Sequence, residues 1–386
     1  MNYIVELAKD TNEHELANSC ALYLWQEVFR HDTRFYGSRA HLQALQRIQP
    51  ALEIDSFEPL HILPRKDGNK LQWIKIYMHE ICTAYRILRS AKREQVKNIV
   101  FLSLSSPTMF FVKKYARAKK LDINLFFTLH GDLQWLVQED LGRSERFFRS
   151  LIQKNLSSAR SNEYYVVYGK TIASKLLTIF PVLQNQLIHL EHPFIQKQNS
   201  HSNPPNLLTI GAFGVISKHK NSHEVIKLAE IMRQRAPVLR FKLVGKFIDQ
   251  LPYNSEIITV LGGRHFLSRQ DYEKQIEETA WLMYLYEDRN YQLIASGAFL
   301  DAVLYNKPII CLRNSFFEDL FSGYEIGILV DTLEELPDAL THLFDRSDLP
   351  EFYASCQENI QRYSDDNKLS KQVAILKSQL TKLNYE

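Results

Sequence analysis

Short apolar runs alternate with longer amphipathic stretches along most of this chain, and this rhythm constrains the fold more than any other feature. In the first half, runs rich in Ile, Val, Phe and Tyr cover residues 3–7, 98–104, 123–129, 164–168 and 187–191. Each run is too short for a helix and too uniformly apolar for a half-exposed strand, so we expect buried parallel strands. Such strands in alternation with helices predict right-handed crossovers and a doubly wound α/β sheet.

The same pattern predicts the helices and the domain boundaries. Helices are expected over residues 107–120, 144–158, 170–180, 222–235, 268–279, 296–305, 333–344, 350–363 and 368–383. Further strands are expected over residues 207–210, 239–244, 257–261, 281–286, 308–312 and 326–330. We therefore predict a Rossmann-like domain over 1–195, a polar, proline-ended linker over 196–206, a second Rossmann-like domain over 207–365, and a C-terminal helix over 366–386 that packs back on the first domain.

Composition excludes several classes of protein. The chain has 386 residues, enough for two domains, and its 47 Lys and Arg against 44 Asp and Glu give a formal charge of +3. This charge is too small to indicate a nucleic-acid partner. The four cysteines are scattered, the N-terminal residues do not resemble a signal peptide, and no apolar run is long enough to span a bilayer. We expect a cytoplasmic protein.

The loop that follows the strand at 207–210 is the first candidate ligand site, because open α/β sheets bind ligands at the carboxyl ends of their strands. Gly211 and Gly214 would let the backbone approach a ligand, and Lys218 or Lys220 would supply charge for a diphosphate. Asn221 or the serine after it would cap the next helix. A glycine turn with solvated lysines is an equally open interpretation.

Two more loops carry usable chemistry. Gly263 leaves room for a base or a phosphate, and Arg264 offers a guanidinium fork, unless the two form only an exposed turn. Ser296 and Gly297 stand where a helix should start, so their backbone N–H groups would face a bound anion. Asp301 lies about one turn further and would accept hydrogen bonds from ribose hydroxyls, since an acidic residue on an apolar helix needs a partner. The alternative is a capping serine with a solvated aspartate.

The order of short motifs in the second half resembles the donor-binding domain of GT-B-fold glycosyltransferases, in particular the bacterial glycan-building type. Lys220-Asn221 matches the end of the family's opening glycine loop, and residues 241–245 (FKLVG) match a later strand. Residues 301–310 (DAVLYNKPII) and 327–330 (GILV) match the acidic helix with its following strand and the closing strand. The resemblance covers roughly residues 207–331.

The resemblance implies two Rossmann-like domains facing a cleft, in which a sugar passes from a nucleoside-diphosphate sugar to a glycan or lipid-linked glycan acceptor. It implies a UDP-sugar donor and neither a cofactor nor a metal. Retaining members carry two glutamates eight positions apart; Asp301 takes the second place, but Leu293 takes the first, so the sugar contact does not carry over. A sugar-nucleotide epimerase or phosphorylase on the same fold and a non-catalytic nucleotide-sugar-binding scaffold remain the alternatives.

In the first half, His130 and Asp132 follow the strand at 123–129 and resemble the family's strand-end histidine. His130 could hold the sugar or move a proton, with Asp132 orienting it or acting as the base. The loop after the first strand offers Asp10, Glu13 and His14 as further candidates for the base. The alternatives are that His130 bonds a backbone carbonyl beneath a turn, and that the second group only caps the following helix.

Two basic clusters lie in the first half, at residues 86–97 and 113–120. They comprise Arg86, Arg89, Lys92, Arg93, Lys97, Lys113, Lys114, Arg117, Lys119 and Lys120. On an acceptor domain such clusters could contact an anionic membrane surface, which would suit a lipid-linked acceptor. Solvated helix faces are the alternative.

Overall fold

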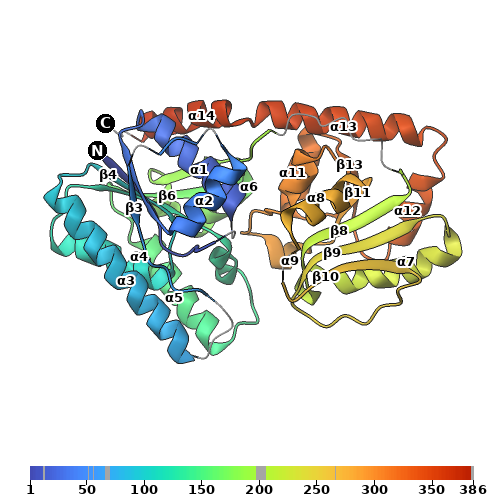
Figure 1. Ribbon diagram of the computed structural model, residues 1–386, viewed down its shortest axis with the longest axis horizontal. Coiled ribbons are helices and arrows are strands. Elements are labelled where there is room, and N and C mark those ends of the chain that lie inside the picture. Colours follow the sequence, from blue (N-terminus) through green and yellow to red (C-terminus); the bar gives the residue numbers. More distant parts are fainter. Residues whose placement is uncertain are drawn as a thin grey trace. The chain divides into compact units, whose positions relative to one another are not determined.

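The computed structural model describes residues 1–11, 14–50, 52–54, 56–65, 70–196, 206–265 and 267–383. The chain divides into two compact units, each built on one parallel sheet (Figure 1). Unit 1 comprises Met1–Ile195, Leu293–Ala295 and Asn367–Glu386, and unit 2 comprises Gln196–Gln292 and Ser296–Asp366. Apart from its two end residues, the predicted linker lies outside the described residues.

Unit 1 contains a seven-stranded sheet in the order β3-β2-β1-β4-β5-β6-β7, with every pairing parallel. Its strands are β1 (Asn2–Glu6), β2 (Thr33–Gly37), β3 (Phe57–Pro59), β4 (Asn98–Ser103), β5 (Asn124–Thr128), β6 (Glu163–Tyr168) and β7 (Leu187–Leu190). The sequence pattern predicted β1 and β4 to β7. It did not predict β2 and β3, whose short polar-interrupted sequences lack an apolar run.

The helices of unit 1 cover both faces of this sheet. They are α1 (Glu15–Val28), α2 (Arg39–Ile48), α3 (Lys70–Arg93), α4 (Ser106–Ala118), α5 (Arg143–Ser157), α6 (Lys170–Ile179) and α14 (Leu369–Lys382), with 3₁₀ turns η1 (Gly131–Leu136) and η2 (Pro181–Leu183). Alternate strand residues enter separate cores: Phe101 packs in the cluster that α3 to α6 complete, and Val100 in the cluster that α1, α2 and α14 complete. Figure 1 shows α3, α4 and α5 on one side of the sheet and α1 and α14 on the other.

The C-terminal helix α14 also satisfies the edge of this sheet. The Gln379 side chain accepts from His189 N (3.0 Å) and donates to His189 O (2.6 Å), so its amide pairs with strand β7 as another strand would. Gln372 accepts from the backbone of Glu191 at 3.2 Å. These bonds occupy an edge that would otherwise offer unpaired backbone groups to another chain.

Unit 2 contains a six-stranded parallel sheet in the order β10-β9-β8-β11-β12-β13, the strand order of a dinucleotide-binding Rossmann fold. Its strands are β8 (Thr209–Ile216), β9 (Arg240–Phe247), β10 (Ile258–Gly263), β11 (Trp281–Tyr284), β12 (Ile309–Leu312) and β13 (Gly327–Val330). Its helices are α7 (Ser222–Arg235), α8 (Arg269–Glu277), α9 (Asp288–Tyr291), α10 (Phe299–Leu304), α11 (Ser315–Gly323), α12 (Leu336–Phe344) and α13 (Leu349–Asp366), with the 3₁₀ turn η3 (Lys218–Lys220). The prediction of two doubly wound α/β domains is confirmed.

Several predicted boundaries in unit 2 are wrong. Strand β8 does not end at residue 210 but continues to Ile216, so Gly211 and Gly214 lie inside the strand, and Gly263 likewise ends β10. The glycines suggested a loop, but β8 pairs with β9 along its whole length, and this pairing overrides the low strand propensity of glycine. Helix α10 begins at Phe299 rather than at 296, because the preceding residues form a turn.

A row of three glycines crosses the carboxyl ends of β8, β9 and β10. Gly214 pairs with Gly245, and Gly245 pairs with Gly262, with φ angles of 96°, 147° and 118°. A Cβ on Gly245 would lie 1.8 Å from the Gly214 carbonyl oxygen, and one on Gly262 would lie 1.9 Å from the Gly245 carbonyl oxygen. The three strands can therefore pair here only with glycine in the second and third of these positions.

We predict that Gly245→Ala lowers the free energy of unfolding by about 3 kcal/mol or more, because the methyl group meets a backbone oxygen and the φ angle disfavours alanine. Urea denaturation measures the change. The matched control is Gly263→Ala in the same sheet, where a Cβ has no atom within 4 Å and the expected change is below about 0.5 kcal/mol. Equal stability of the two variants would contradict the strand pairing described.

Candidate functional site

In unit 2 the residues that follow β8 and β11 meet around a pair of tyrosines. The rings of Tyr286 and Tyr291 stack with centroids 4.3 Å apart and planes 10° apart. Lys220, at the end of η3, places its Nζ 5.3 Å from the centre of the Tyr286 ring, and its charge lowers the pKa of the Tyr291 hydroxyl against the larger effect of burial. Burial raises the pKa of the Tyr286 hydroxyl, and the neighbouring Ser296 acts in the opposite direction. Two residues that the sequence placed in separate loops therefore lie beside the same tyrosine.

Asn221 holds this arrangement in place. It occupies the N-cap position of α7 with φ 54°, but its side chain does not cap the helix as predicted. Instead its Nδ2 donates to the Leu285 carbonyl at 3.0 Å and to Glu287 at 3.2 Å, just beyond β11. The loop after β8 is thus bonded to the end of β11, which keeps Lys220 beside Tyr286.

Asp301 lies half-buried on α10 and accepts a hydrogen bond of 2.7 Å from the Tyr272 hydroxyl. Burial raises the pKa of Asp301 to about 6, although Tyr272, Arg269 and, more weakly, Lys220 act in the opposite direction. Gly214 completes this corner, since a Cβ there would lie 3.9 Å from the Tyr272 hydroxyl. The structure therefore brings the ends of β8 and β11 together with α8 and the start of α10.

The other predicted residues of unit 2 lie elsewhere. Gly211 is buried, and a Cβ there would lie 2.5 Å from the Phe213 ring, which gives the glycine a packing role. The Lys218 backbone donates to Asp249 at 2.7 Å and its side chain is exposed. Gly263 and the exposed Arg264 stand at the end of the edge strand β10, two places from β8. Gly297 is exposed in the turn before α10.

Sequence reasoning missed the tyrosines of this site. Tyr286 and Tyr291 are 4% and 8% exposed, and Tyr272 comes from a helix that we treated only as a crossover. A signal was present, because residues 284–291 (YLYEDRNY) place three tyrosines directly at the end of a predicted strand. An aromatic cluster at a strand end is a candidate ligand site even where no family motif marks it.

In unit 1, His130 follows β5 and places its Nε2 2.7 Å from the carbonyl oxygen of Leu102 in β4. The alternative interpretation of a bond to a backbone carbonyl is therefore correct for this nitrogen, which acts as the donor. Nδ1 is then the acceptor nitrogen of the neutral ring. The ring also meets that of His14 edge-on at 5.6 Å, and burial lowers the pKa of His130 against the opposing effect of the Leu102 bond. Asp132 is exposed in η1.

The loop after β1 is organised by a buried carboxylate that the sequence did not reveal. Glu6 accepts from the backbone N–H groups of Ala8 (2.7 Å) and Lys9 (2.9 Å), from the Asn18 amide (2.7 Å) and from the Ser103 hydroxyl. Asp10 lies half-buried in this loop and Glu13 lies outside the described residues. His14 occupies the N-cap position of α1 without a capping side-chain bond, so the interpretation of this residue as a cap is wrong.

Leu293 takes the position of the family's sugar-contacting glutamate. Its side chain is 1% exposed and packs in the hydrophobic core of unit 1, and its N–H donates to the Gln134 side chain at 3.0 Å. The position is therefore an apolar packing position in this chain. In the described part of the chain, no helix is both long and apolar enough to cross a membrane.

The chain thus has two units, each built on a parallel sheet in Rossmann strand order, and this is the architecture of GT-B-fold proteins. The chain is similar along its whole length to sucrose-phosphate synthase from Thermosynechococcus elongatus (11% identity, TM-score 0.66, 100% and 99% of the two chains covered). It is likewise similar to HepE from Anabaena, solved with UDP-glucose (13%, 0.62, 100% and 100%), and to WaaG, a glycosyltransferase involved in lipopolysaccharide biosynthesis (10%, 0.62, 99% and 99%). No family model and no curated protein matches the chain. The TM-scores show that the chain shares the fold of these proteins, and at identities this low the similarity shows the fold alone.

We predict that Asp301→Asn stabilises the protein at pH 7.5 by about 1–2 kcal/mol, after allowance for its partial exposure. The folded pKa of about 6 lies above the ordinary value of 3.8, so the carboxylate costs stability above pH 6, and this cost disappears near pH 4. Urea denaturation at both pH values measures the difference. The control is Asp319→Asn, an exposed position on α11 where changes should stay below about 0.5 kcal/mol. A variant less stable than the native chain at pH 7.5 would contradict the prediction.

Proposed function

We propose that this protein is a glycosyltransferase that moves a sugar from a nucleoside-diphosphate sugar to a glycan or glycolipid acceptor in polysaccharide or glycoconjugate biosynthesis. The observation that carries the proposal is the convergence of two groups at the carboxyl edge of a Rossmann sheet: Lys220 lies over the Tyr286 ring, beside Ser296, and Asp301 accepts from Tyr272 beside Gly214. A cation, a hydroxyl and a carboxylate at this edge match the diphosphate and the ribose of a nucleotide. The fold shared with HepE, solved with UDP-glucose, supports a UDP-sugar as donor.

In this proposal Lys220 neutralises the leaving diphosphate, helped by the backbone N–H groups at Ser296 and Gly297, so that the reaction needs no metal. Asp301 accepts hydrogen bonds from the ribose hydroxyls. With a pKa of about 6 it is largely ionised at neutral pH and can act as an acceptor only. Lys218, Gly263 and Arg264, which lie apart from this cluster, are secondary candidates for donor contacts.

We assign the acceptor side to unit 1. His130 is the leading candidate for the base, because its Nε2 is held by the Leu102 carbonyl and its Nδ1 is the nitrogen able to accept a proton. Asp132 is exposed beside it. Asp10 lies in the loop fixed by Glu6 and is, together with Glu13, an alternative base. These roles follow from the chemistry of the side chains at the carboxyl ends of β1 and β5.

The proposal is tested by incubating the protein with UDP-, GDP- and CDP-sugars and measuring nucleotide release with and without glycan or glycolipid acceptors. We expect the protein to release UDP from a UDP-sugar. An acceptor should accelerate this release, and EDTA should leave its rate unchanged. Conversion of one donor sugar into another without acceptor would indicate an epimerase instead. Nucleotide binding without release under any acceptor would indicate a non-catalytic subunit, and loss of activity in EDTA would overturn metal independence.

We predict that Lys220→Met weakens UDP binding about tenfold, because a charge-assisted contact with the diphosphate is lost. Isothermal titration calorimetry of the purified protein with UDP measures the affinity. Lys274→Met is the matched control, since it removes the same charge from an exposed side chain on α8 to which no ligand contact is assigned. Equal losses in both variants would show that Lys220 acts only through the general electrostatic field of the unit.

We further propose that the protein works in the cytoplasm, at the inner face of the membrane. Helix α3 exposes Leu71, Ile74 and Met78 by 69%, 57% and 55%, at helical spacing, with the exposed Arg86 and Arg89 further along. An apolar stripe with basic residues favours contact with an anionic bilayer surface. We expect Ile74→Glu to lower co-sedimentation with phosphatidylglycerol vesicles severalfold relative to the native chain. Unchanged co-sedimentation would exclude this face.

A further inference from the structure

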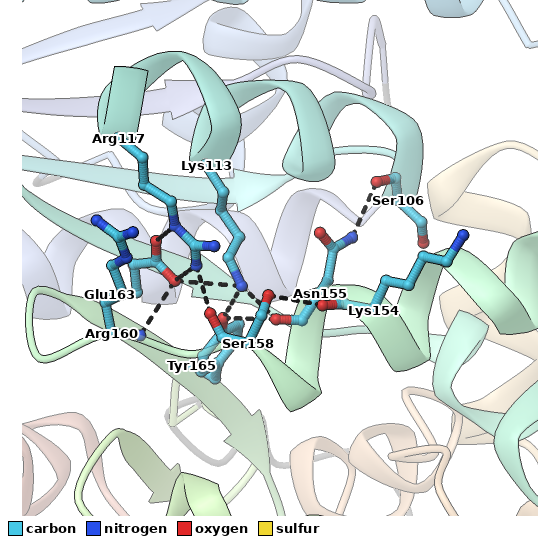
Figure 2. Close-up of polar contacts among 9 residues, drawn as sticks. All are labelled: Ser106, Lys113, Arg117, Lys154, Asn155, Ser158, Arg160, Glu163 and Tyr165. Atoms are coloured by element: carbon cyan, nitrogen blue, oxygen red, sulfur yellow. Dashed lines mark hydrogen bonds and ion pairs between the residues drawn. The ribbon is translucent and has the colours of Figure 1, made fainter. Parts of the chain in front are cut away.

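A pocket of about 380 Å³ opens on unit 1 between α4 and α5. Figure 2 shows the polar contacts of residues in and beside its wall. Its lining comprises Phe110, Lys113, Lys114, Arg117, Lys154, Asn155 and Ser158, so four of seven lining residues are cations. Beside it lies Glu163, the first residue of β6, whereas His130 follows the last residue of β5. Because these strands are parallel, the pocket lies at the opposite edge of the sheet from His130 and is separate from the candidate acceptor site.

The inner wall of the pocket holds more positive than negative charge. Arg117 donates to both oxygens of the buried Glu163, at 2.8 and 2.7 Å, and Lys113 Nζ lies 3.2 Å from the same carboxylate. Lys113 is itself 2% exposed and donates to the Tyr165 hydroxyl at 2.6 Å and to the Asn155 carbonyl oxygen. One carboxylate thus faces two cations, and the exposed Lys114 and Lys154 add two more. The wall therefore has charge left for an anion.

The charge state of Lys113 agrees with this. Burial lowers the pKa of Lys113 to about 8, although Glu163 acts in the opposite direction. A buried ammonium group that one carboxylate compensates incompletely is stabilised by a further anion. An uncharged ligand would bring no such gain.

Asn155 supplies the second requirement. Its side chain is 1% exposed, its Nδ2 donates to the Ser106 carbonyl at 3.0 Å (Figure 2), and its Oδ1 lacks a hydrogen-bond partner among the described residues. A buried acceptor without a donor costs about 1–3 kcal/mol. Asn155 is among the residues that line the pocket, although Oδ1 itself is covered. In the proposed site its side chain turns this oxygen toward the ligand, whose hydroxyl group donates to it while the anionic part meets the cations.

We propose that this pocket binds a phosphate ester with a hydroxyl group on a neighbouring carbon, the chemistry shared by glycerol phosphates, sugar phosphates and a phosphatidylglycerol headgroup. Lys114, Lys154 and Arg117 hold the phosphate, and the hydroxyl donates to Asn155 Oδ1. The pocket has the volume of a small-molecule site. It is a second binding site, distinct from the donor and acceptor sites.

The test is calorimetric titration of the full chain with sn-glycerol 3-phosphate and with methyl phosphate, which lacks the hydroxyl. We expect saturable binding of glycerol 3-phosphate, about tenfold tighter than methyl phosphate. In Lys114→Gln/Lys154→Gln, affinity should fall at least about tenfold. The matched control is Lys92→Gln/Lys97→Gln, which loses the same charge at exposed positions outside the pocket and should bind as the native chain does.

Asn155→Ala tests the hydroxyl contact, with its thermal melting curve as the check on folding. It should bind both phosphates with similar affinity, because only the preference is lost. Absence of binding by the native chain, or equal affinity of the two lysine variants, would overturn the site; equal affinity of the native chain for both phosphates would overturn the role of Asn155. Release of the protein from phosphatidylglycerol vesicles by glycerol 3-phosphate would assign the lipid headgroup as the source, and vesicle binding without release would assign the soluble ester.

Discussion

The reversal of strand order beside the first strand of each sheet is the constraint on which both candidate sites depend. In unit 2, β8 and β11 are neighbours although β9, β10 and the helices between these strands separate them in sequence. The chain therefore leaves β8 and β11 in opposite directions across the sheet, at the point where open α/β sheets bind ligands. In each unit a side-chain hydrogen bond joins the two neighbouring strands where the strand order reverses. Asn221 joins the loop after β8 to the Leu285 carbonyl, and Glu6 joins the loop after β1 to Ser103 at the end of β4. The two units use different residues for the same mechanical purpose.

These junctions put polar groups where packing alone would place apolar ones. Glu6 is fully buried, and its cost is met by several donors that converge on one carboxylate. Asp301 receives less compensation, and burial therefore raises its pKa. A carboxylate that burial destabilises gains more from a ligand that donates hydrogen bonds to it. Burial of the apolar residues on the sheet faces stabilises the fold and offsets the free-energy cost of these buried carboxylates.

The sequence allowed the fold to be predicted because buried parallel strands have a periodic, local signature. It failed where pairing partners decide the structure: β8 runs through Gly211 and Gly214 because β9 pairs with it, and the partner is remote in sequence. Side-chain networks are equally remote. Lys113 appeared to belong to a solvated basic cluster, but it is buried on Glu163, and only the three-dimensional arrangement brings these residues together.

The leucine at position 293 indicates that nucleotide binding and sugar binding, which the family resemblance combines in one donor site, depend on different residues in this chain. A carboxylate at this position would have to be buried among the apolar residues of the unit 1 core, which is strongly unfavourable. The absence of the glutamate is therefore linked to the packing around Leu293, and restoring the glutamate would also require changes in the residues that surround it. In the proposed function, Lys220, Ser296 and Asp301 hold the nucleotide through unit 2, while the sugar must be selected by other groups. Nucleotide affinity and sugar selectivity thus depend on different residues in this chain, and a change in one need not alter the other.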